Sequence, residues 1–233
     1  MQNHLISIIL PIHKQSDHIQ NLVDQFEAEL SKLPVAHELL LVVNGDDKKS
    51  LKACQEVAQN HKSIRVLFSE KSGWGLAVQL GLKEAKGDIL CYTNSARTTP
   101  KDLLLFCVYA IANPEVVLKA TRTIRDSVIR ALGSLLYNME CRALFDLNNW
   151  DVNGTPKVFP RKFDRLTNLS KENDLIDLEF SLVCKTQNYP MLEIPILSSR
   201  RHGGYSTTKI PSAFRMYSGA FQMWRAHRKD LTK

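Results

Sequence analysis

Blocks of two kinds alternate along the first hundred residues of the chain. Short apolar runs rich in Ile, Leu and Val occupy residues 4–13, 38–45, 63–68 and 88–93. Between these runs, apolar residues recur at helical spacing over residues 17–33, 50–61 and 75–85, and Gly87 is expected to cap the last of these helices. Apolar runs of this length are typical of strands buried on both faces. Their alternation with helices predicts an α/β fold with a mostly parallel sheet.

The second half of the chain has a less regular pattern. It predicts an amphipathic helix over residues 125–147, a turn and strand over 151–159, and a helix over 174–187. A strand at residues 191–197 contains Pro195, which is typical of an edge or irregular position, and a last helix covers 211–228. The sequence has no repeat, no low-complexity tract and no obvious linker, so we expect one domain.

Composition and charge narrow the class of protein. The 233 residues include 31 Lys and Arg against 24 Asp and Glu, which gives a net charge of +7 and favours an anionic partner. No apolar run approaches the roughly 18–20 residues that a bilayer span needs, and the first residues lack the features of a signal peptide. The five cysteines form no C-x-x-C pair, so we expect a reducing, cytoplasmic environment without disulfides.

The loops that follow the predicted strands are the candidate functional positions. In open parallel sheets, ligands bind beyond the carboxyl ends of the strands. Residues 11–15, 44–47, 68–75 and 93–97 occupy those positions. We expect them to converge on one crevice.

Five segments, in this order, carry a resemblance to a known family. ISIILPIHKQSDHI is similar to a strand and P-x-Y-N-E turn, ELLLVVNGDD to V-V-D-D-G-S, and DVNGTPKVFPR and DLIDLEF to two later motifs. The most specific block, EKSGWGLAVQLGLKEAKGDIL, matches a pattern of small residues ending in Asp at Gly73, Gly75, Ala77, Gly81, Ala85, Gly87 and Asp88. The chain thus resembles glycosyltransferase family 2, and within it the dolichol-phosphate mannose synthase-like enzymes.

The resemblance implies a GT-A type fold, with a mostly parallel Rossmann-like sheet flanked by helices in a single domain. It implies a nucleotide-binding half at residues 1–105 and an acceptor-side half at 106–233. The implied reaction is inverting transfer of a hexose from a nucleotide sugar to a polyprenyl phosphate or a glycan. The donor-site positions that match the family are Pro11, His13, Gln15, Asn44, Asp46, Gly73, Thr93, Asn94, Ser95, Arg122 and Arg130.

The chain departs from the family at the metal-binding D-x-D motif. The aligned residues are Thr93–Arg97, which contain no acid, whereas Mg²⁺ and Mn²⁺ prefer charged oxygen ligands. We therefore expect no metal and no other cofactor. Arg97 is a candidate to neutralise the donor diphosphate instead, helped by Arg122 and Arg130, because a guanidinium binds phosphates bidentately. The alternative is that Arg97 is a solvated loop residue.

Other donor-site positions also lack the family's acids. Asn44 stands in place of an Asp and Gln15 in place of a Glu, while His13 replaces a Tyr and could still stack on a base. Asp46 or Asp47 is a substitute carboxylate after a shift of one residue. The alternatives are a plain turn at Asn44-Gly45 and a structural histidine.

Inverting transfer to a sugar hydroxyl requires a general base, whereas an anionic phosphate acceptor requires none. Asp151, Asp177 and Glu179 are the candidate bases, and the resemblance favours Asp151 and Glu179 as catalytic residues alongside Arg97. Each carboxylate has a structural alternative: a turn cap for Asp151, an ion pair for Glu179, and the polar face of a helix for Asp177.

A glycine-containing basic segment, RRHGGYSTTK, resembles the R-x-x-G-x-S-K loop that closes over donor and acceptor phosphate. Its candidate residues are Arg200, Arg201, Ser206 and Lys209. A surface loop without a ligand is the alternative. The last helix combines aromatic and basic residues, which fits peripheral contact with the inner face of a membrane or packing against the core.

Two functions of different class follow. The first is the glycosyltransferase described above, and the second is a non-catalytic GT-A homologue that binds nucleotide or acts as a scaffold. The loss of acids from three motifs of one crevice motivates the second. The three Trp residues, at positions 74, 150 and 224, are scattered and no nucleic-acid-binding module is recognisable, so we expect no nucleic-acid partner.

Overall fold

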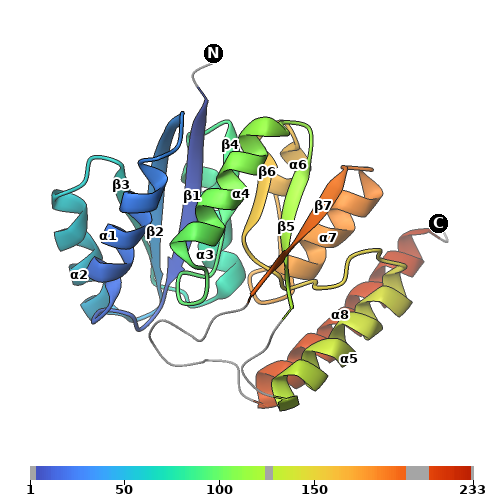
Figure 1. Ribbon diagram of the computed structural model, residues 1–233. Helices are drawn as coiled ribbons and strands as arrows, with labels where there is room; N and C mark the ends of the chain where they lie inside the picture. Colours follow the sequence, from blue (N-terminus) through green and yellow to red (C-terminus); the bar gives the residue numbers. More distant parts are fainter. Residues whose placement is uncertain (1–3, 124–127, 198–209, 232–233) are drawn as a thin grey trace.

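A computed structural model describes residues 4–123, 128–197 and 210–231 of the chain. In this part of the chain, seven strands form one sheet in the order β3-β2-β1-β4-β6-β5-β7 (Figure 1). The strands are β1 (Leu5–Ile12), β2 (Ala36–Asn44), β3 (Ile64–Ser69), β4 (Ile89–Tyr92), β5 (Val117–Arg122), β6 (Lys157–Pro160) and β7 (Met191–Ile196). Only β6 runs antiparallel to its neighbours, so the other six described strands point the same way.

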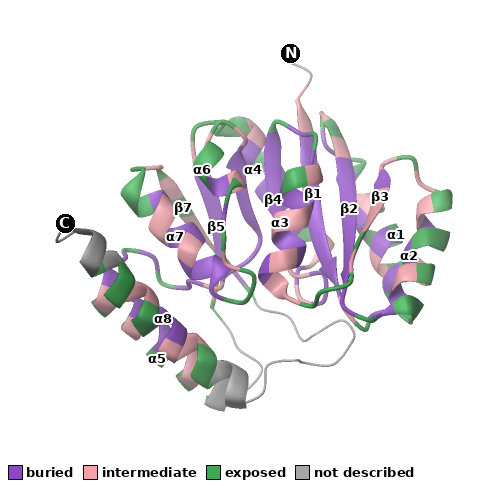
Figure 2. Cartoon of the chain, turned by 180° about the vertical axis from the view of Figure 1, so that it is seen from behind, coloured by how far each residue is buried: buried purple, intermediate pink, exposed green. Residues whose placement is uncertain are grey.

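Helices cover both faces of the sheet. On one face lie α1 (Ile19–Leu30), α2 (Lys48–Gln59) and α4 (Pro100–Ala112); on the other lie α3 (Trp74–Glu84), α6 (Asp164–Thr167) and α7 (Ile176–Thr186). Side chains of a strand alternate between faces, so Ile8 and Leu10 join the first core while Ile9 joins the second. Figure 2 shows the central strands buried along nearly their whole length.

A third layer stands apart from the sheet. It is formed by α5 (Val128–Phe145) and α8 (Ile210–Leu231), which lie side by side and run in the same direction (Figure 1). Tyr137 and Cys141 of α5 share a small core with Ala220 of α8 and Leu178 of α7. This core attaches the helix pair to the body of the molecule.

Most of the predicted elements are confirmed, with ends that differ by a few residues. The predicted strands and helices of the first hundred residues correspond to β1–β4 and α1–α3, and β7 is an edge strand as Pro195 indicated. The prediction missed α4, β5 and the short α6. The predicted division at residue 105 lies inside α4, and one sheet runs through both halves.

The role predicted for Gly87 is wrong. Helix α3 ends at Glu84 and its C-cap is Ala85, which has extended backbone. A Cβ at position 87 would lie 2.5 Å from the carbonyl oxygen of Leu5 and 2.6 Å from the amide nitrogen of Ser7. Glycine is therefore required there because the chain passes against β1, not because it stops the helix.

Candidate active site

The loops that were expected to form a crevice lie at one edge of the sheet. Because β1, β2, β3, β4, β5 and β7 share a direction, their carboxyl ends meet at the same edge, at the bottom of Figure 1. The segments that follow these strands therefore gather there. They carry most of the predicted site residues that the structure describes.

At the end of β1, the chain turns against the start of α2. The amide of Lys14 donates to Asp47 Oδ2 at 2.6 Å, and the amide of Gln15 donates to Ser50 Oγ at 3.1 Å. Burial opposes ionisation of Asp47, but the hydrogen bonds from Ser50 and Lys14 outweigh it and lower the pKa of this carboxyl. Asp47 therefore organises the corner, while its neighbour Asp46, the predicted donor ligand, is exposed.

Asn44, the residue that replaces the family's Asp, is buried at the end of β2. Its Nδ2 donates to the carbonyl oxygen of Gly73 at 3.1 Å, and its backbone carbonyl oxygen lies 3.3 Å from His13 Nδ1. Asn44 thus joins the ends of β1 and β2 to the start of α3. Three of the residues predicted for the donor site, His13, Asn44 and Gly73, thus lie together.

The glycine block at the start of α3 is closely covered by another loop. A Cβ on Gly73 would lie 2.5 Å from the carbonyl oxygen of Glu172, and one on Gly75 would lie 2.0 Å from that of Lys171. The amide of Leu76 also donates to Glu172 at 3.0 Å. These glycines are therefore required by packing against residues 171–173, a reason the sequence pattern did not reveal.

The turn after β4, where the family holds its metal, contains oxygens that are engaged within the turn. The hydroxyls of Thr93 and Thr98 are 2.5 Å apart. Ser95 Oγ donates to the carbonyl oxygen of Pro11 at 3.0 Å and to Gln15 Oε1 at 3.1 Å. A divalent cation here would have to displace these bonds and would gain neutral ligands only.

The remaining residues of this turn also offer no charged oxygen ligand to a metal. Asn94 Oδ1 accepts the amide of Ala96 at 3.0 Å, and Arg97 is partly exposed on the same turn. Within the described part of the chain, no three His, Cys, Asp or Glu side chains gather where they could hold a metal. The residues of this turn therefore do not fit Mg²⁺ or Mn²⁺.

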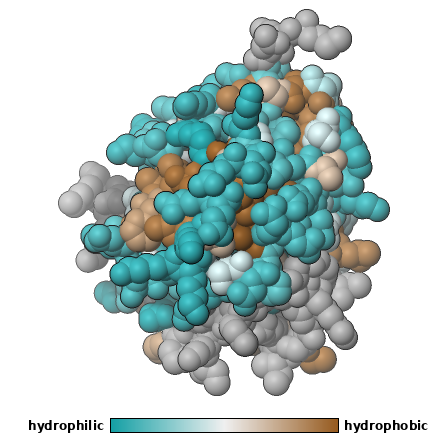
Figure 3. Space-filling view, turned by 90° about the vertical axis from the view of Figure 1, so that its left-hand side faces the viewer, coloured by the Kyte–Doolittle hydropathy of each residue, from teal (hydrophilic) through white to brown (hydrophobic). Residues whose placement is uncertain are grey.

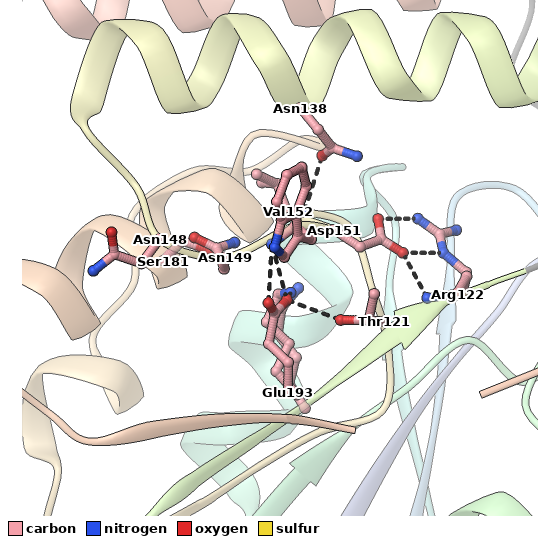
Figure 4. Close-up of polar contacts among 12 residues, drawn as sticks. Thr121, Arg122, Asn138, Asn148, Asn149, Asp151, Val152, Ser181 and Glu193 are labelled. Carbon is pink, nitrogen blue, oxygen red and sulfur yellow. Dashed lines mark hydrogen bonds and ion pairs between the residues drawn. The ribbon is translucent and has the colours of Figure 1, made fainter. Parts of the chain in front are cut away.

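Arg122 and Asp151 form an ion pair at the end of β5. Arg122 Nε and Nη2 donate to the two carboxylate oxygens of Asp151 at 2.7 and 2.8 Å, and the Arg122 amide donates to the same group at 3.1 Å (Figure 4). Burial acts to lower the pKa of Arg122, but the bonds to Asp151 outweigh it and raise the pKa above its ordinary value. Both oxygens of the candidate base thus accept from one guanidinium.

Glu179 lies on α7 and holds the loop that covers the glycine block. Its two carboxylate oxygens accept the amide of Ser170 at 2.9 Å each, the hydroxyl of Ser170 at 2.6 Å and the amide of Lys171 at 2.8 Å. Glu179 therefore acts on α3 through this loop. No arginine partner of Glu179 is seen in the described residues.

Asp177, a candidate base whose structural alternative was the polar face of its helix, is buried. It accepts hydrogen bonds from Trp74 Nε1 at 3.1 Å and from Tyr92 Oη at 3.0 Å, and it pairs with the ammonium of Lys157. Lys157 has no exposed surface, and burial lowers its pKa to about 8 although Asp177 acts in the opposite direction. The cluster joins α3, β4, β6 and α7.

A second buried lysine lies beside this cluster. Lys119 on β5 is directly paired in the sheet with Lys157, and its Nζ donates to Glu193 Oε1 at 2.6 Å. Glu193 also accepts from the Thr121 hydroxyl at 2.9 Å and from the Trp150 amide at 2.9 Å (Figure 4). Burial lowers the pKa of Lys119.

The sequence analysis did not identify Lys119, Lys157 or Glu193. For Lys157 and Glu193 the available signal was a charged residue within a predicted strand, because Lys and Glu are rarely fully buried unless they are paired. Lys119 lies in β5, a strand that the sequence analysis missed. Arg200, Arg201, Ser206 and Lys209 lie outside the described residues, as does the side chain of Arg130.

Fold and site together define a scaffold of the GT-A type: a mostly parallel sheet with its loops gathered at the carboxyl edge. The chain belongs to glycosyl transferase family 2, whose family model matches residues 7–166. This match confirms the family predicted from the motifs.

Curated relatives agree with the predicted branch. The chain is 24% identical over 140 residues to an undecaprenyl-phosphate 4-deoxy-4-formamido-L-arabinose transferase from Pectobacterium atrosepticum, a match that covers 59% of this chain and 43% of that protein. The same-named protein of Pseudomonas fluorescens is 24% identical over 139 residues, covering 58% and 41%. The chain thus spans less than half the length of these curated relatives.

Solved structures agree with the predicted fold. Glucosyl-3-phosphoglycerate synthase from Mycobacterium tuberculosis, solved with uridine diphosphate, superposes with a TM-score of 0.69 at 12% identity, covering 96% of this chain and 79% of that one. Mannosyl-3-phosphoglycerate synthase from Rubrobacter xylanophilus superposes with a TM-score of 0.70 at 16% identity, covering 98% and 75%. The GT-A type fold is confirmed.

Proposed function

We propose that this protein is an inverting glycosyltransferase that moves a hexose from a nucleotide sugar to a polyprenyl phosphate without a divalent metal. Membership of the family and the names of the curated relatives support the reaction class and the acceptor class. A glycan acceptor is the other acceptor class that the sequence allowed. The state of the candidate bases is the observation that separates the two.

All three candidate carboxylates are engaged within the protein. Asp151 binds Arg122, Glu179 binds the loop at residues 170–171, and Asp177 binds Lys157, Tyr92 and Trp74. A sugar hydroxyl must lose a proton as it attacks, and this requires a positioned base. A phosphate oxygen is already anionic at neutral pH, so these contacts favour the polyprenyl phosphate.

Arginines supply the charge that a metal supplies elsewhere in the family. Arg97 follows β4 and Arg122 ends β5, and both of these strands finish at the carboxyl edge of the sheet. A guanidinium with fixed orientation stabilises the charge that develops on a leaving diphosphate. Asp151 fixes the orientation of Arg122. Asp151 is therefore a positioning residue in this proposal.

A second candidate is a non-catalytic nucleotide-binding or scaffolding subunit. Its support is that Gln15, Asn44, Thr93 and Ser95 stand where the family has acids, and that the side chains of Asn44 and Ser95 are bonded within the protein. This candidate predicts binding of a nucleotide sugar without transfer.

An acceptor of this type resides in a membrane, so we place the reaction at a membrane surface, on its cytoplasmic side. None of the described helices is long and apolar enough to cross a bilayer. Contact with the membrane is therefore proposed as peripheral for the part of the chain that is described.

The test is calorimetric binding of nucleotide sugars with Mn²⁺ and with EDTA, followed by transfer to a detergent-solubilised polyprenyl phosphate. We expect binding and transfer in EDTA. Arg97→Ala is expected to weaken donor binding by about 1–3 kcal/mol, the effect of losing a hydrogen bond to a charged group. Arg165→Ala, on exposed α6, is the matched control.

Three results would contradict the proposal in different ways. Binding that requires Mn²⁺ and ignores Arg97→Ala would return the metal to the mechanism. Binding without transfer to any lipid phosphate would favour the non-catalytic subunit. Transfer to a glycan but not to a lipid phosphate would overturn the acceptor class.

A further inference from the structure

One buried carboxylate contacts two chain segments that carry predicted donor-site residues. Asp177 Oδ2 accepts the indole N–H of Trp74 at 3.1 Å, and its Oδ1 accepts the hydroxyl of Tyr92 at 3.0 Å. Trp74 is the first residue of α3 and directly follows Gly73. Tyr92 is the last residue of β4 and directly precedes Thr93. Trp74, Asp177 and Tyr92 thus form a bridge, the Asp177 bridge, between the glycine block and the turn after β4.

The charge of the Asp177 bridge is balanced inside the protein. Lys157 has no exposed surface, its ammonium pairs with Asp177 Oδ1, and it lies 5.3 Å from the ring centroid of Tyr92. Asp177 is 5% exposed and lies in the first turn of α7, where the helix dipole stabilises a carboxylate. Burial raises the pKa of Tyr92, so its hydroxyl keeps its proton and donates at neutral pH. The bridge is therefore a fixed anion between two hydrogen-bond donors.

Ring contacts hold the two donors in place. The rings of Trp74 and Tyr92 meet edge to face with their centroids 6.4 Å apart. Tyr92 also meets the ring of Phe180, on α7, edge to face at 5.8 Å. Edge-to-face contacts of this kind favour one relative orientation of the two rings. The bridge therefore has a defined geometry.

The same turn of α7 holds the glycine block by a second route. Glu179 binds the loop at residues 170–171. The next residue of that loop, Glu172, accepts the amide of Leu76 at 3.0 Å. The first turn of α3 is thus tied to α7 directly through Trp74 and indirectly through this loop.

The start of α3 has helix neighbours on one side only among the described elements. The other described helices on its face of the sheet, α6 and α7, lie toward β5 and β7 (Figure 1). On the other side, β3 is the edge strand of the sheet, and the molecule seen from there has a mostly hydrophilic surface (Figure 3). Contacts with α7 therefore have a large share in fixing where α3 begins.

We propose that the Asp177 bridge positions the nucleotide sugar by fixing the distance between the glycine block and the turn after β4. Predicted donor-site residues stand on both segments, with Gly73 on the first and residues 93–97 on the second. A ligand that contacts both segments binds more tightly when their spacing is set in advance, because less ordering is required on binding. Trp74, Asp177 and Tyr92 are positioning residues in this inference, which rests on the proposed function.

The test removes one donor at a time and leaves the Asp177–Lys157 pair intact, because loss of either charge would leave the other buried and uncompensated. Trp74→Phe removes the indole N–H, and Tyr92→Phe removes the hydroxyl. The measurement is the KM for the nucleotide sugar in transfer to a detergent-solubilised polyprenyl phosphate. Each variant should raise this KM about tenfold, as loss of a hydrogen bond to a charged group does. The kcat and the KM for polyprenyl phosphate should stay within about twofold, because the lost interaction concerns binding of the donor.

The double variant Trp74→Phe/Tyr92→Phe distinguishes a bridge from two separate contacts. If Asp177 must bind both segments, either substitution alone breaks the bridge, and the double variant should also raise the KM about tenfold. Two independent contacts would add in free energy and raise it about a hundredfold. A rise of that size, or an unchanged KM in both single variants, would overturn the proposal. Tyr92→Phe keeps its ring and so tests the bridge even if Trp74→Phe does not fold.

Two matched controls make the same chemical changes away from the bridge. Trp224→Phe alters a half-buried residue of α8 that packs in the small core with α5 and α7. Tyr109→Phe alters a residue of α4 that is 42% exposed. Both controls should leave the KM for the nucleotide sugar unchanged. An equal rise in the controls would show a general effect on the fold and overturn the assignment to the bridge.

Calorimetric binding of the nucleotide sugar to the same variants separates this inference from the proposed function. If the protein transfers sugar and the bridge variants behave as the unaltered protein does, the bridge is wrong and the enzyme stands. If it binds a nucleotide sugar that the bridge variants bind about tenfold more weakly, but never transfers the sugar, the enzyme is wrong and the bridge stands. Absence of any nucleotide-sugar binding would overturn both.

Discussion

Three ion pairs are buried or largely buried beneath the carboxyl edge of the sheet: Arg122 with Asp151, Lys157 with Asp177, and Lys119 with Glu193. A buried ion pair contributes little net stability compared with an apolar pair, because both charges lose hydration. Removing one partner is costly, however, because the other charge remains buried and uncompensated. These residues therefore fix the geometry of the site more than they stabilise the fold.

At the residue scale, we predict that Asp151→Asn lowers the free energy of unfolding by about 3 kcal/mol, because Arg122 loses a charged acceptor in a buried setting. The measurement is urea denaturation at neutral pH. Asp146→Asn is the matched control, since Asp146 pairs with Lys185 but is almost fully exposed, and it should leave stability nearly unchanged. Equal effects in the two variants would contradict the structural role of the Arg122–Asp151 pair.

At the scale of elements, close packing places α3 on the sheet. A Cβ on Gly81 would lie 2.3 Å from Cγ2 and 2.7 Å from Cγ1 of Ile9, so α3 approaches β1 at a distance that only glycine allows. Helix α5 also contains a glycine, Gly133, but a Cβ there would meet nothing within 4 Å. The two helices thus use glycine in different ways.

We therefore predict that replacing each glycine by alanine changes the stability of the protein in opposite directions. Gly81→Ala should destabilise the protein by about 1–3 kcal/mol, the usual cost of overpacking a core. Gly133→Ala should stabilise it by up to about 1 kcal/mol, because alanine loses less entropy in a helix and has room here. Thermal unfolding of both variants checks this, and a stabilising Gly81→Ala would show that α3 does not pack closely on β1.

At the scale of the whole molecule, all five cysteines are buried thiols, without a disulfide among them. Burial raises the pKa of Cys54, Cys107, Cys141 and Cys184 to about 12 from an ordinary 9.0, and it raises the pKa of Cys91 well above 9.0. Above pH 9 the unfolded chain loses protons that the folded chain keeps. Stability from these groups is therefore present below pH 9 and is lost as the pH rises toward 12.

We predict that the free energy of unfolding falls by about 3–5 kcal/mol between pH 7.5 and pH 10, measured by urea denaturation with a reductant present. Lys157 acts in the opposite direction: its pKa is about 8 when folded and 10.5 when unfolded, so its contribution rises between these values. One lysine offsets only part of the effect of five thiols. In Cys54→Ala the fall should shrink by about 1 kcal/mol, and a stability that rises with pH would contradict buried thiols.

The sequence by itself determined the parallel strands β1–β4 and the edge of the sheet at which the site lies. Apolar runs alternating with helical periods require parallel strands covered on both faces, and the loops after such strands must gather at one edge. The family motifs identified the same loops. Helix α4 was missed although Thr99 and Pro100 mark its start, because its residues are apolar on nearly all sides and show little periodicity.

Tertiary structure decided which charges meet and which apolar side of a helix is left uncovered. Lys157 and Asp177 are 20 residues apart and Arg122 and Asp151 are 29 apart, and only the packing of β5, β6 and α7 brings each pair together. Local spacing holds no information on such contacts. Helix α5 is apolar on both its inner and outer sides, so its periodicity could not tell which side faces the protein, and contact with α7 and α8 made that choice.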